Sequence, residues 1–350
     1  MNGLQRGMIF FGGMALLFSC ASSPAPKETA SRPPLWVTDK EAAYPNAEWL
    51  CVVERRSDRG AAEAAAMNGL AGLFRLDIQS VTETNQRFAQ MLGGKAGETS
   101  LTQSRDFEQE LKTTSNVAGL VGVQRDFWTA GGDVAAIVRM NRKESIARYS
   151  AMIRENSSVI RSLKEDAQRM PATFDAYENL NSAANIAAVT DNFQSILSIL
   201  DPSSTGNKLE YGNAEALKTL AQNAARDIVI TVTVAGDDSG RIAKAFSQYF
   251  TQKGFRTNAA AGANPYVLRA QFEMAPVDMK NERFVFSRYK LQASLEDKKG
   301  AGVFTFLDER RDGALTPSEA QQTNLRKVEA AIADGDFAAK FDAYLDSLLK

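Results

Sequence analysis

FDAYENLNSAANIAAVTDNFQSILSIL, residues 174–200, is the stretch that decides the fold, because its apolar residues recur at the 3.6-residue period of an α-helix. The preceding segment, 143–170, has the same period, and Pro171 separates the two. A proline has no backbone N–H to donate and interrupts a helix. The sequence therefore predicts two long amphipathic helices that turn at 169–172 into an antiparallel hairpin or a coiled-coil arm. The apolar stripes consist of Ile146, Tyr149, Ile153, Ile160, Leu163, Phe174, Tyr177, Leu180, Ile186, Val189, Phe193, Ile196 and Leu200.

The segment before the hairpin predicts a first small α/β module of the β-α-β-β-β type. Its helix, 58–76, is rich in alanine, and small side chains on one helix face allow close docking on a sheet. Its last hairpin is expected to turn at Gly131 and Gly132. The small-residue face carries Ala62, Ala66, Gly69 and Leu73. The expected strands are 47–54, 77–88, 103–115, 117–129 and 133–140.

The segment after the hairpin predicts a second α/β module. It opens with DIVITVTV, 227–234, whose strict alternation is typical of a strand with one buried face. Gly254 is expected to end the following helix, since glycine readily adopts the left-handed conformation of a C-cap. A turn is expected at 297–300. The expected strands are 227–234, 266–274, 284–295 and 302–307, and the expected helices are 239–253, 317–334 and 337–349.

The fold class is therefore α+β, with two small α/β modules linked by a long helical hairpin. A signal peptide and a disordered tether precede them. The expected division of the 350 residues is a lipoprotein signal peptide at 1–19, an acylated cysteine and flexible linker at 20–34, a first module at 35–142, a helical hairpin at 143–222 and a second module at 223–350.

Composition excludes several classes of function. The chain has 41 basic and 42 acidic residues, a net charge of -1, so its overall field does not favour nucleic acid as a partner. It has no histidine, which excludes Ser-His-Asp and Cys-His catalysis and imidazole metal sites. Its 2 cysteines, Cys20 and Cys51, cannot form a four-thiolate zinc site or a disulfide framework. We expect no enzyme activity, no cofactor and no metal.

The two cysteines have different surroundings. Cys51 lies within the apolar strand 47–54 and is expected to be a packed core thiol rather than a nucleophile. Cys20 follows a basic start with Arg6 and an apolar run at 8–18, which is the order of a secretory signal. That run is too short to cross a bilayer as a helix. The segment 22–34 is rich in Ser, Ala and Pro and is expected to be an extended tether.

Leu17-Phe18-Ser19-Cys20 resembles the lipobox of bacterial lipoproteins. The resemblance implies that the thiol of Cys20 receives a diacylglycerol and that the new α-amino group is acylated, for example with palmitate. Several acyl chains are sufficient for stable membrane anchoring. The residue after Cys20 is Ala21 rather than Asp, and in this the sequence resembles lipoproteins exported to the outer membrane. The alternative is an ordinary signal peptide with an incidental cysteine.

A second resemblance covers residues 34–150. Pro34-Leu35-Trp36, Tyr44-Pro45, a strand, an alanine-rich helix and a closing strand resemble the outer-membrane lipoprotein family that includes the Helicobacter membrane-antigen lipoprotein and flagellum-associated members. This chain has Val53-Glu54-Arg55-Arg56 where that family has a Gly-x-Gly. The element order of the second module resembles, as a pattern, the amino-terminal domain of the periplasmic assembly protein TolB.

Two short motifs imitate ligand sites. Residues 308–319 match an EF-hand calcium loop at several positions, but Arg310 stands where a third-position oxygen ligand belongs. Thr316, Pro317 and Glu319 instead predict a capping box at the start of a helix. Residues 92–95, LGGK, lack the first glycine and the hydroxyl residue of a phosphate loop, and a flexible hairpin tip is expected there.

The sequence favours a non-enzymatic, lipid-anchored cell-envelope protein with a structural or assembly role, facing the periplasm from the outer membrane. Its expected partners are the membrane, through the N-terminal lipid, and envelope proteins or a second copy, through the helical hairpin. The competing interpretation is that the stripes of the hairpin pack within the same chain. The alternative function is a binding module for a small molecule or a cell-wall glycan, in a cleft lined by Trp128, Tyr211 or Tyr266.

Overall fold

The computed structural model describes residues 32–74, 84, 120–204, 209–258, 266–278 and 283–348. The expected signal peptide, Cys20 and most of the linker lie outside these residues. So do the loop at 92–95 and the strands predicted at 77–88 and 103–115, apart from Thr84.

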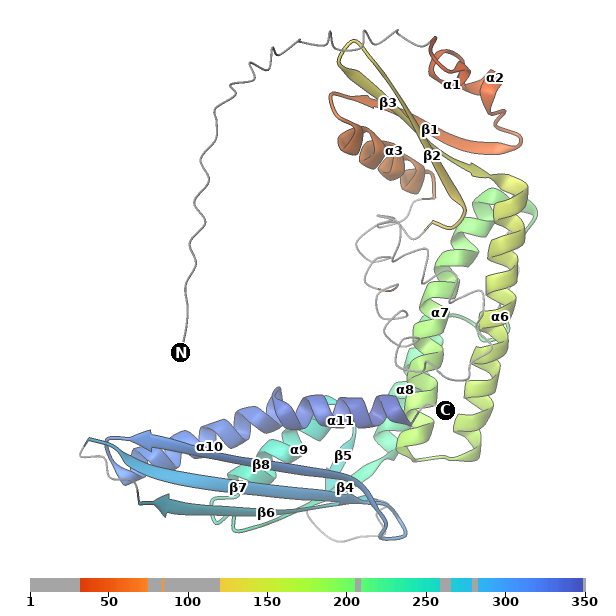
Figure 1. Cartoon of the computed structure of the whole chain (residues 1–350). Coiled ribbons are helices and arrows are strands. Elements are labelled where there is room, and N and C mark those ends of the chain that lie inside the picture. Colours follow the sequence, from red (N-terminus) through yellow and green to blue (C-terminus); the bar gives the residue numbers. More distant parts are fainter. Residues whose placement is uncertain are drawn as a thin grey trace, which may run out of the picture.

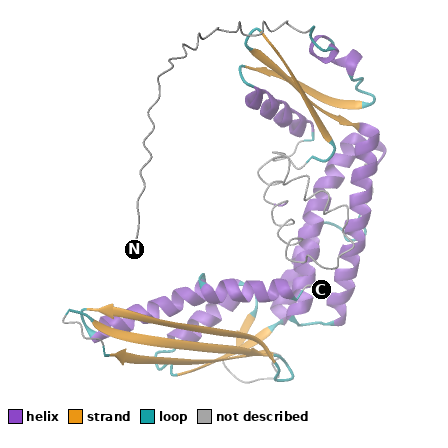
Figure 2. Ribbon diagram, viewed as in Figure 1, coloured by secondary structure: helices purple, strands orange, loops and turns teal. Residues whose placement is uncertain are grey.

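The fold is α+β, as predicted. A three-stranded sheet lies at one end of a pair of long helices, and a five-stranded sheet lies at the other end (Figures 1 and 2). Each sheet has its own hydrophobic core, and one of the two long helices contributes to both.

The first sheet is antiparallel, with the strand order β1-β3-β2. Its strands are β1 (Trp49–Arg56), β2 (Val123–Ala130) and β3 (Asp133–Asn141). The expected turn between β2 and β3 is confirmed, since Gly131 and Gly132 both have positive φ, at 62° and 89°. Such a turn matches the right-handed twist of a hairpin.

Helices cover both faces of this sheet. α3 (Arg59–Leu73) packs Ala62 and Ala66 on one face and brings Gly69 so close that a Cβ there would lie 2.8 Å from Val52 Cγ1. The predicted small-residue face is thus confirmed at these three positions and wrong at Leu73, which is exposed because the helix ends there. The short helices α1 (Leu35–Thr38) and α2 (Lys40–Ala43), absent from the sequence prediction, place Trp36 in the cluster on the other face.

The predicted helical hairpin is present as α6 (Arg142–Arg169) and α7 (Phe174–Leu200). The bounds of α7 coincide with those of its apolar stripe. Asn141 and Thr173 cap the two N-termini with their side chains, and Ala172 turns the chain with φ 57°. α8 (Ala214–Asp227), which was not predicted, packs along α7, and the expected boundary at 222/223 lies within it. A short 3-10 helix, η1 (Pro202–Ser204), follows α7.

The apolar stripes of the hairpin pack within the same chain. Most of their members are buried among α3, the first sheet and each other, and the remaining ones are half-buried. The stripes therefore offer no open groove for a partner helix. The buried members are Tyr149, Ile153, Ile160, Phe174, Ile186, Val189, Phe193, Ile196 and Leu200.

The second sheet has the strand order β5-β4-β6-β7-β8. β4 (Val229–Ala235) is parallel to β5 (Arg256–Asn258) and β6 (Tyr266–Val277), whereas β7 (Val285–Glu296) and β8 (Gly302–Ala314) continue it antiparallel. The helices α9 (Arg241–Gln252), α10 (Pro317–Ala333) and α11 (Asp336–Ser347) lie together on one face (Figure 1). The three-residue β5 was not predicted.

Several local predictions in this module are confirmed. Gly254 has φ 91°, and the N–H of Phe255 bonds to the carbonyl of Phe250 at 3.0 Å, which is the six-to-one bond of a Schellman motif. Thr316 and Glu319 form the expected capping box of α10. The calcium-loop imitation is instead a strand, because β8 continues to Ala314, well beyond the predicted end at 307.

Candidate functional site

The cysteine predictions have different outcomes. Cys20, the predicted lipidation site, lies outside the described residues. Cys51 is buried in β1 beside Trp36 and Ile137, so the predicted core thiol is confirmed. Burial raises the pKa of the Cys51 thiol, and this outweighs the opposing effect of Lys40 and Arg139. A thiol held protonated in this way is a poor nucleophile.

Of the three aromatic residues expected to line a cleft, Tyr211 lines a groove beside α6, and the other two do not share that groove. Tyr211 is largely buried, and its hydroxyl donates to Asp191 Oδ1 at 3.2 Å. Tyr266 is buried in the second core, and its hydroxyl accepts the N–H of Phe174 at 3.2 Å. Trp128, on β2, is half-buried. The three rings therefore pack in different parts of the fold and do not line one groove together.

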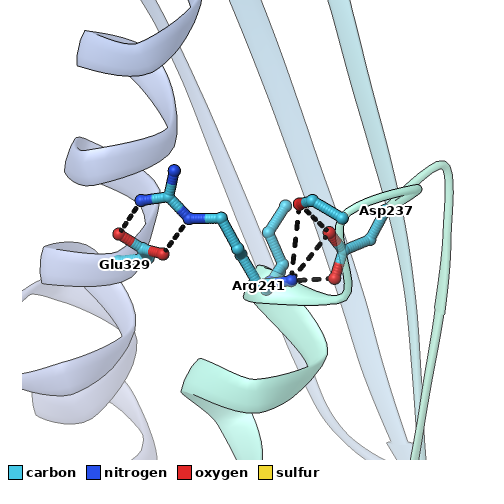
Figure 3. A network of polar contacts seen from close by, with 5 residues as sticks. Asp237, Arg241 and Glu329 are labelled. Atoms are coloured by element: carbon cyan, nitrogen blue, oxygen red, sulfur yellow. Dashed lines mark hydrogen bonds and ion pairs between the residues drawn. The ribbon is translucent and has the colours of Figure 1, made fainter.

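The most developed polar cluster surrounds the start of α9 (Figure 3). The carboxylate of Asp237 accepts the backbone N–H groups of Arg241, Ile242 and Ala243 at 3.1, 2.8 and 2.9 Å. These are donors that the first turn of a helix leaves without a partner. A helix start after a parallel strand is a common binding site for anions, but here a carboxylate of the same chain occupies it.

The side chain of Arg241 joins α9 to α10. Its Nε and Nη2 donate to the two carboxylate oxygens of Glu329, both at 2.7 Å (Figure 3). This bidentate contact raises the pKa of the Arg241 guanidinium. The charges of Arg241 and Glu329 thereby neutralise each other.

A shallow groove of about 300 Å³ runs beside this ion pair. Tyr249, at its floor, is buried, and its hydroxyl donates to Asp342 Oδ1 at 3.2 Å. Burial, with the charge of Asp342, raises the pKa of Tyr249 far above its ordinary value. The groove can therefore offer hydrogen bonds, and the raised pKa keeps the Tyr249 hydroxyl protonated at neutral pH. Its lining is Arg241, Lys244, Ala245, Gln248, Tyr249, Gln252, Glu329 and Ala333.

A second groove, of about 180 Å³, lies between α6 and the loop before α8. Arg161 and Glu210 form an ion pair across it. Beneath it, Asp191 accepts from Tyr211 and, at 2.8 Å, from the N–H of Ala214. Burial raises the pKa of Asp191, although both hydrogen bonds oppose this.

Within the described part of the chain, no three His, Cys, Asp or Glu side chains come together in a way that could hold a metal ion. Among the same residues, no helix has the length and apolar character needed to cross a membrane.

Comparison with known proteins found no matching family model and no matching curated protein. Among solved structures, a minor lipoprotein from Acinetobacter baumannii is similar over 34% of this chain and 90% of its own, with 14% identity and a TM-score of 0.25. The secreted protein HP1454 from Helicobacter pylori is similar over 81% of this chain and 97% of its own, with 11% identity and a TM-score of 0.37. The resemblance to a lipoprotein and a secreted protein is loose, and scores this low carry no argument about function.

Proposed function

We propose that this chain is a lipid-anchored cell-envelope protein with a structural or assembly role and no enzyme activity. One observation carries the proposal: Cys20 directly follows a basic start, a short apolar run and Leu17-Phe18-Ser19. A thioether to diacylglycerol at Cys20, together with further acylation, would hold the protein on a membrane. Ala21, in place of Asp, supports the outer membrane, with the folded part facing the periplasm.

The polar groups of the folded part support the non-enzymatic role. The contacts of Arg241 with Glu329 and of Tyr289 with Asp308 join elements of the fold to one another. The carboxylate that caps α9 is likewise internal. Such groups contribute to rigidity, which a scaffold needs.

The two grooves described above offer little room for the alternative, a small-molecule binding module. Sites for small molecules enclose about 300–1,000 Å³ and bury most of the ligand. The groove beside α9 is at the lower limit with about 300 Å³, and the groove beside α6 has about 180 Å³. Ion pairs within the chain cross both of them.

The anchor can be tested with Cys20→Ser and a matched control, Ser22→Ala. Membranes of the native host would be separated from soluble proteins after labelling with radioactive palmitate. The control is expected to carry label and remain in the membrane fraction, whereas the Cys20→Ser protein carries none. Mass spectrometry of the N-terminal peptide would contradict the proposal if it found an unmodified thiol at Cys20 in the wild-type protein.

The assembly role needs a separate test. The acylated protein, solubilised in mild detergent, is expected to migrate on a native gel in a complex larger than the monomer. In-cell cross-linking should capture the same neighbours. A purely monomeric protein in both measurements would leave the anchor intact and contradict the assembly role.

A further inference from the structure

Within the described part of the chain, no helix covers one face of the five-stranded sheet. α9, α10 and α11 all lie on the opposite face (Figure 1). On the uncovered face, the register sets side chains of β6, β7 and β8 beside one another in rows. The central rows mix polar and charged groups with one leucine, as expected for a face in water. These rows are Gln271-Gln292-Leu307 and Glu273-Lys290-Glu309.

The residues of this face become apolar at the end of the sheet that is far from the helical hairpin. There, β7 begins and β8 ends, and three residues form an apolar tip: Phe284, Phe286 and Leu315. The exposed fractions are 44% for Phe284 and 70% for Leu315. Phe286 pairs with Gly313, where a Cβ would lie 2.6 Å from Phe286 Cε1, so the ring lies directly across the glycine. Isolated exposed apolar residues are ordinary, but a contiguous set marks an interaction surface.

Two arginines lie one row behind the tip. Arg288 and Arg311 face each other directly on β7 and β8. Like charges in this position destabilise a sheet, and their cost is removed when an anion lies between them. Arg288 contacts Glu309 at 3.3 Å, whereas Arg311 has no acidic partner among the described residues. The row therefore has positive charge that the fold itself leaves unneutralised.

We infer that this end of the second sheet binds the surface of an anionic lipid bilayer. Phe284, Phe286 and Leu315 enter the interface between headgroups and acyl chains, and Arg288 and Arg311 bind lipid phosphates. Guanidinium groups match phosphate oxygens with two parallel hydrogen bonds. Aromatic and apolar side chains backed by basic residues are typical of proteins that lie on a membrane surface.

The surroundings of the tip favour a bilayer over a protein segment. The tip is the end of a sheet, and neither of the two grooves described above includes any of its residues, so neither groove would seat an incoming helix there. The inference rests on the proposed lipid anchor in one respect. An anchor on the same bilayer raises the local concentration of lipid around the tip, so a weak contact is sufficient.

The test uses the full acylated protein reconstituted in vesicles. Leu315→Cys would carry an environment-sensitive fluorophore, and Lys298→Cys, at the opposite end of the β7–β8 hairpin, is the matched control. Vesicles would contain phosphatidylcholine alone or equal parts of phosphatidylcholine and phosphatidylglycerol, with brominated lipids as quenchers. We expect a blue shift and quenching at position 315 with the anionic vesicles, and neither change at position 298.

The arginines are tested in the same vesicles with Arg288→Gln and Arg311→Gln. Arg269→Gln is the control, because Arg269 lies on the same face but contacts Glu296 at 3.2 Å. Loss of one arginine near an anionic surface should reduce the ratio of inserted to aqueous probe about five-fold, and added salt should do the same. Circular dichroism would establish that each variant folds.

The two proposals fail in different ways. If the protein floats with the vesicles while the probe at position 315 stays in water with both lipids, the tip inference is wrong and the anchor stands. If the protein is not acylated and does not float, the anchor is wrong. The tip inference then survives only if added anionic vesicles still shift the probe at position 315. Equal insertion into both kinds of vesicle would contradict the role of Arg288 and Arg311.

Discussion

The backbone N–H of Phe174 donates to the hydroxyl of Tyr266 at 3.2 Å, and their ring centroids lie 4.2 Å apart, although 92 positions separate them in the sequence. This contact places the first residue of α7 inside the core of the second sheet. Phe255 and Phe341 complete the surroundings of the Phe174 ring, with centroid distances of 5.2 and 5.7 Å. The hairpin and the second sheet therefore share a core at this point.

Phe174→Ala should be among the most destabilising substitutions in the chain. The side chain is fully buried, and removing such a phenylalanine leaves a cavity that costs about 3–5 kcal/mol of unfolding free energy. Met170→Ala, at an exposed position of the same turn, should change stability by less than about 0.5 kcal/mol. Urea unfolding measures both. Equal midpoints for the two variants would contradict the shared core.

Asp191 should make stability depend on pH. Because burial raises the pKa of its carboxyl in the folded protein, the folded state binds the proton more tightly than the unfolded state. The resulting contribution to stability is complete below the unfolded pKa of about 3.9 and is lost as pH rises through the folded pKa. Asp191→Asn, an amide that does not titrate, should not show this decline.

The matched variant Asp191→Ala separates charge from hydrogen bonding. It leaves the Tyr211 hydroxyl and the Ala214 N–H without their acceptor, and each buried donor without a partner costs about 1–3 kcal/mol. At pH 7 it should be less stable than Asp191→Asn. Thermal unfolding across pH 3.5 to 7.5 measures the pH dependence and the loss of hydrogen bonds. Parallel curves of stability against pH for wild type and Asp191→Asn would contradict the pH dependence assigned to Asp191.

Gly236 should tolerate no side chain, whereas nearby Gly240 should tolerate one at moderate cost. Both have positive φ, at 79° and 67°, so alanine at either position costs about 1–2 kcal/mol in backbone conformation. A Cβ on Gly236 would in addition lie 2.1 Å from the carbonyl oxygen of Phe272, whereas Gly240 has nothing within 4 Å. Gly236→Ala must therefore displace β4 from β6. Denaturant titration should rank it well below Gly240→Ala, and the reverse order would contradict this packing.

Loss of the Asp237 carboxylate should lower the stability of the fold more than loss of the ion pair between Arg241 and Glu329. Asp237→Ala leaves three N–H groups of α9 without their acceptor and should cost about 1–2 kcal/mol, as for other lost helix caps. Glu329→Gln weakens a pair whose side chains are 41% and 32% exposed, so solvent screens the pair and its loss should cost less than the loss of the cap. Asp238→Ala, at an exposed neighbour, is the control. Equal losses for Asp237→Ala and Asp238→Ala in thermal unfolding would contradict the cap.

The parts of the fold that could be predicted are those in which local pattern and tertiary packing agree. The period of the stripe from Phe174 to Leu200 reproduces the bounds of α7, and Thr316 with Glu319 marks the start of α10. α8 was missed although its buried face, Leu217, Ala221 and Ala225, recurs every four residues as a helix requires. β5 has too few residues for any period to show.

The end of β8 could not be predicted because charged residues hide its alternation. Asp308 points inward and is buried, where it accepts from the Tyr289 hydroxyl at 2.6 Å and from Arg310 at 3.0 Å. A buried carboxylate in a strand is stable only with such partners. Here Tyr289 lies on β7, and Arg310 lies two residues after Asp308 on β8. The burial of Tyr211 and Tyr266 could not be predicted either, because the residues that contact them, Asp191 and Phe174, are distant in the sequence.

The continuity of α7 sets the spacing of the two sheets. Its 27 residues rise about 1.5 Å each, so the helix is about 40 Å long, with no break at which the ends could bend independently. Lengthening α6, α7 and α8 together by two turns would move the sheets apart by roughly 10 Å. The number of residues in α7 therefore sets the distance between the two sheets.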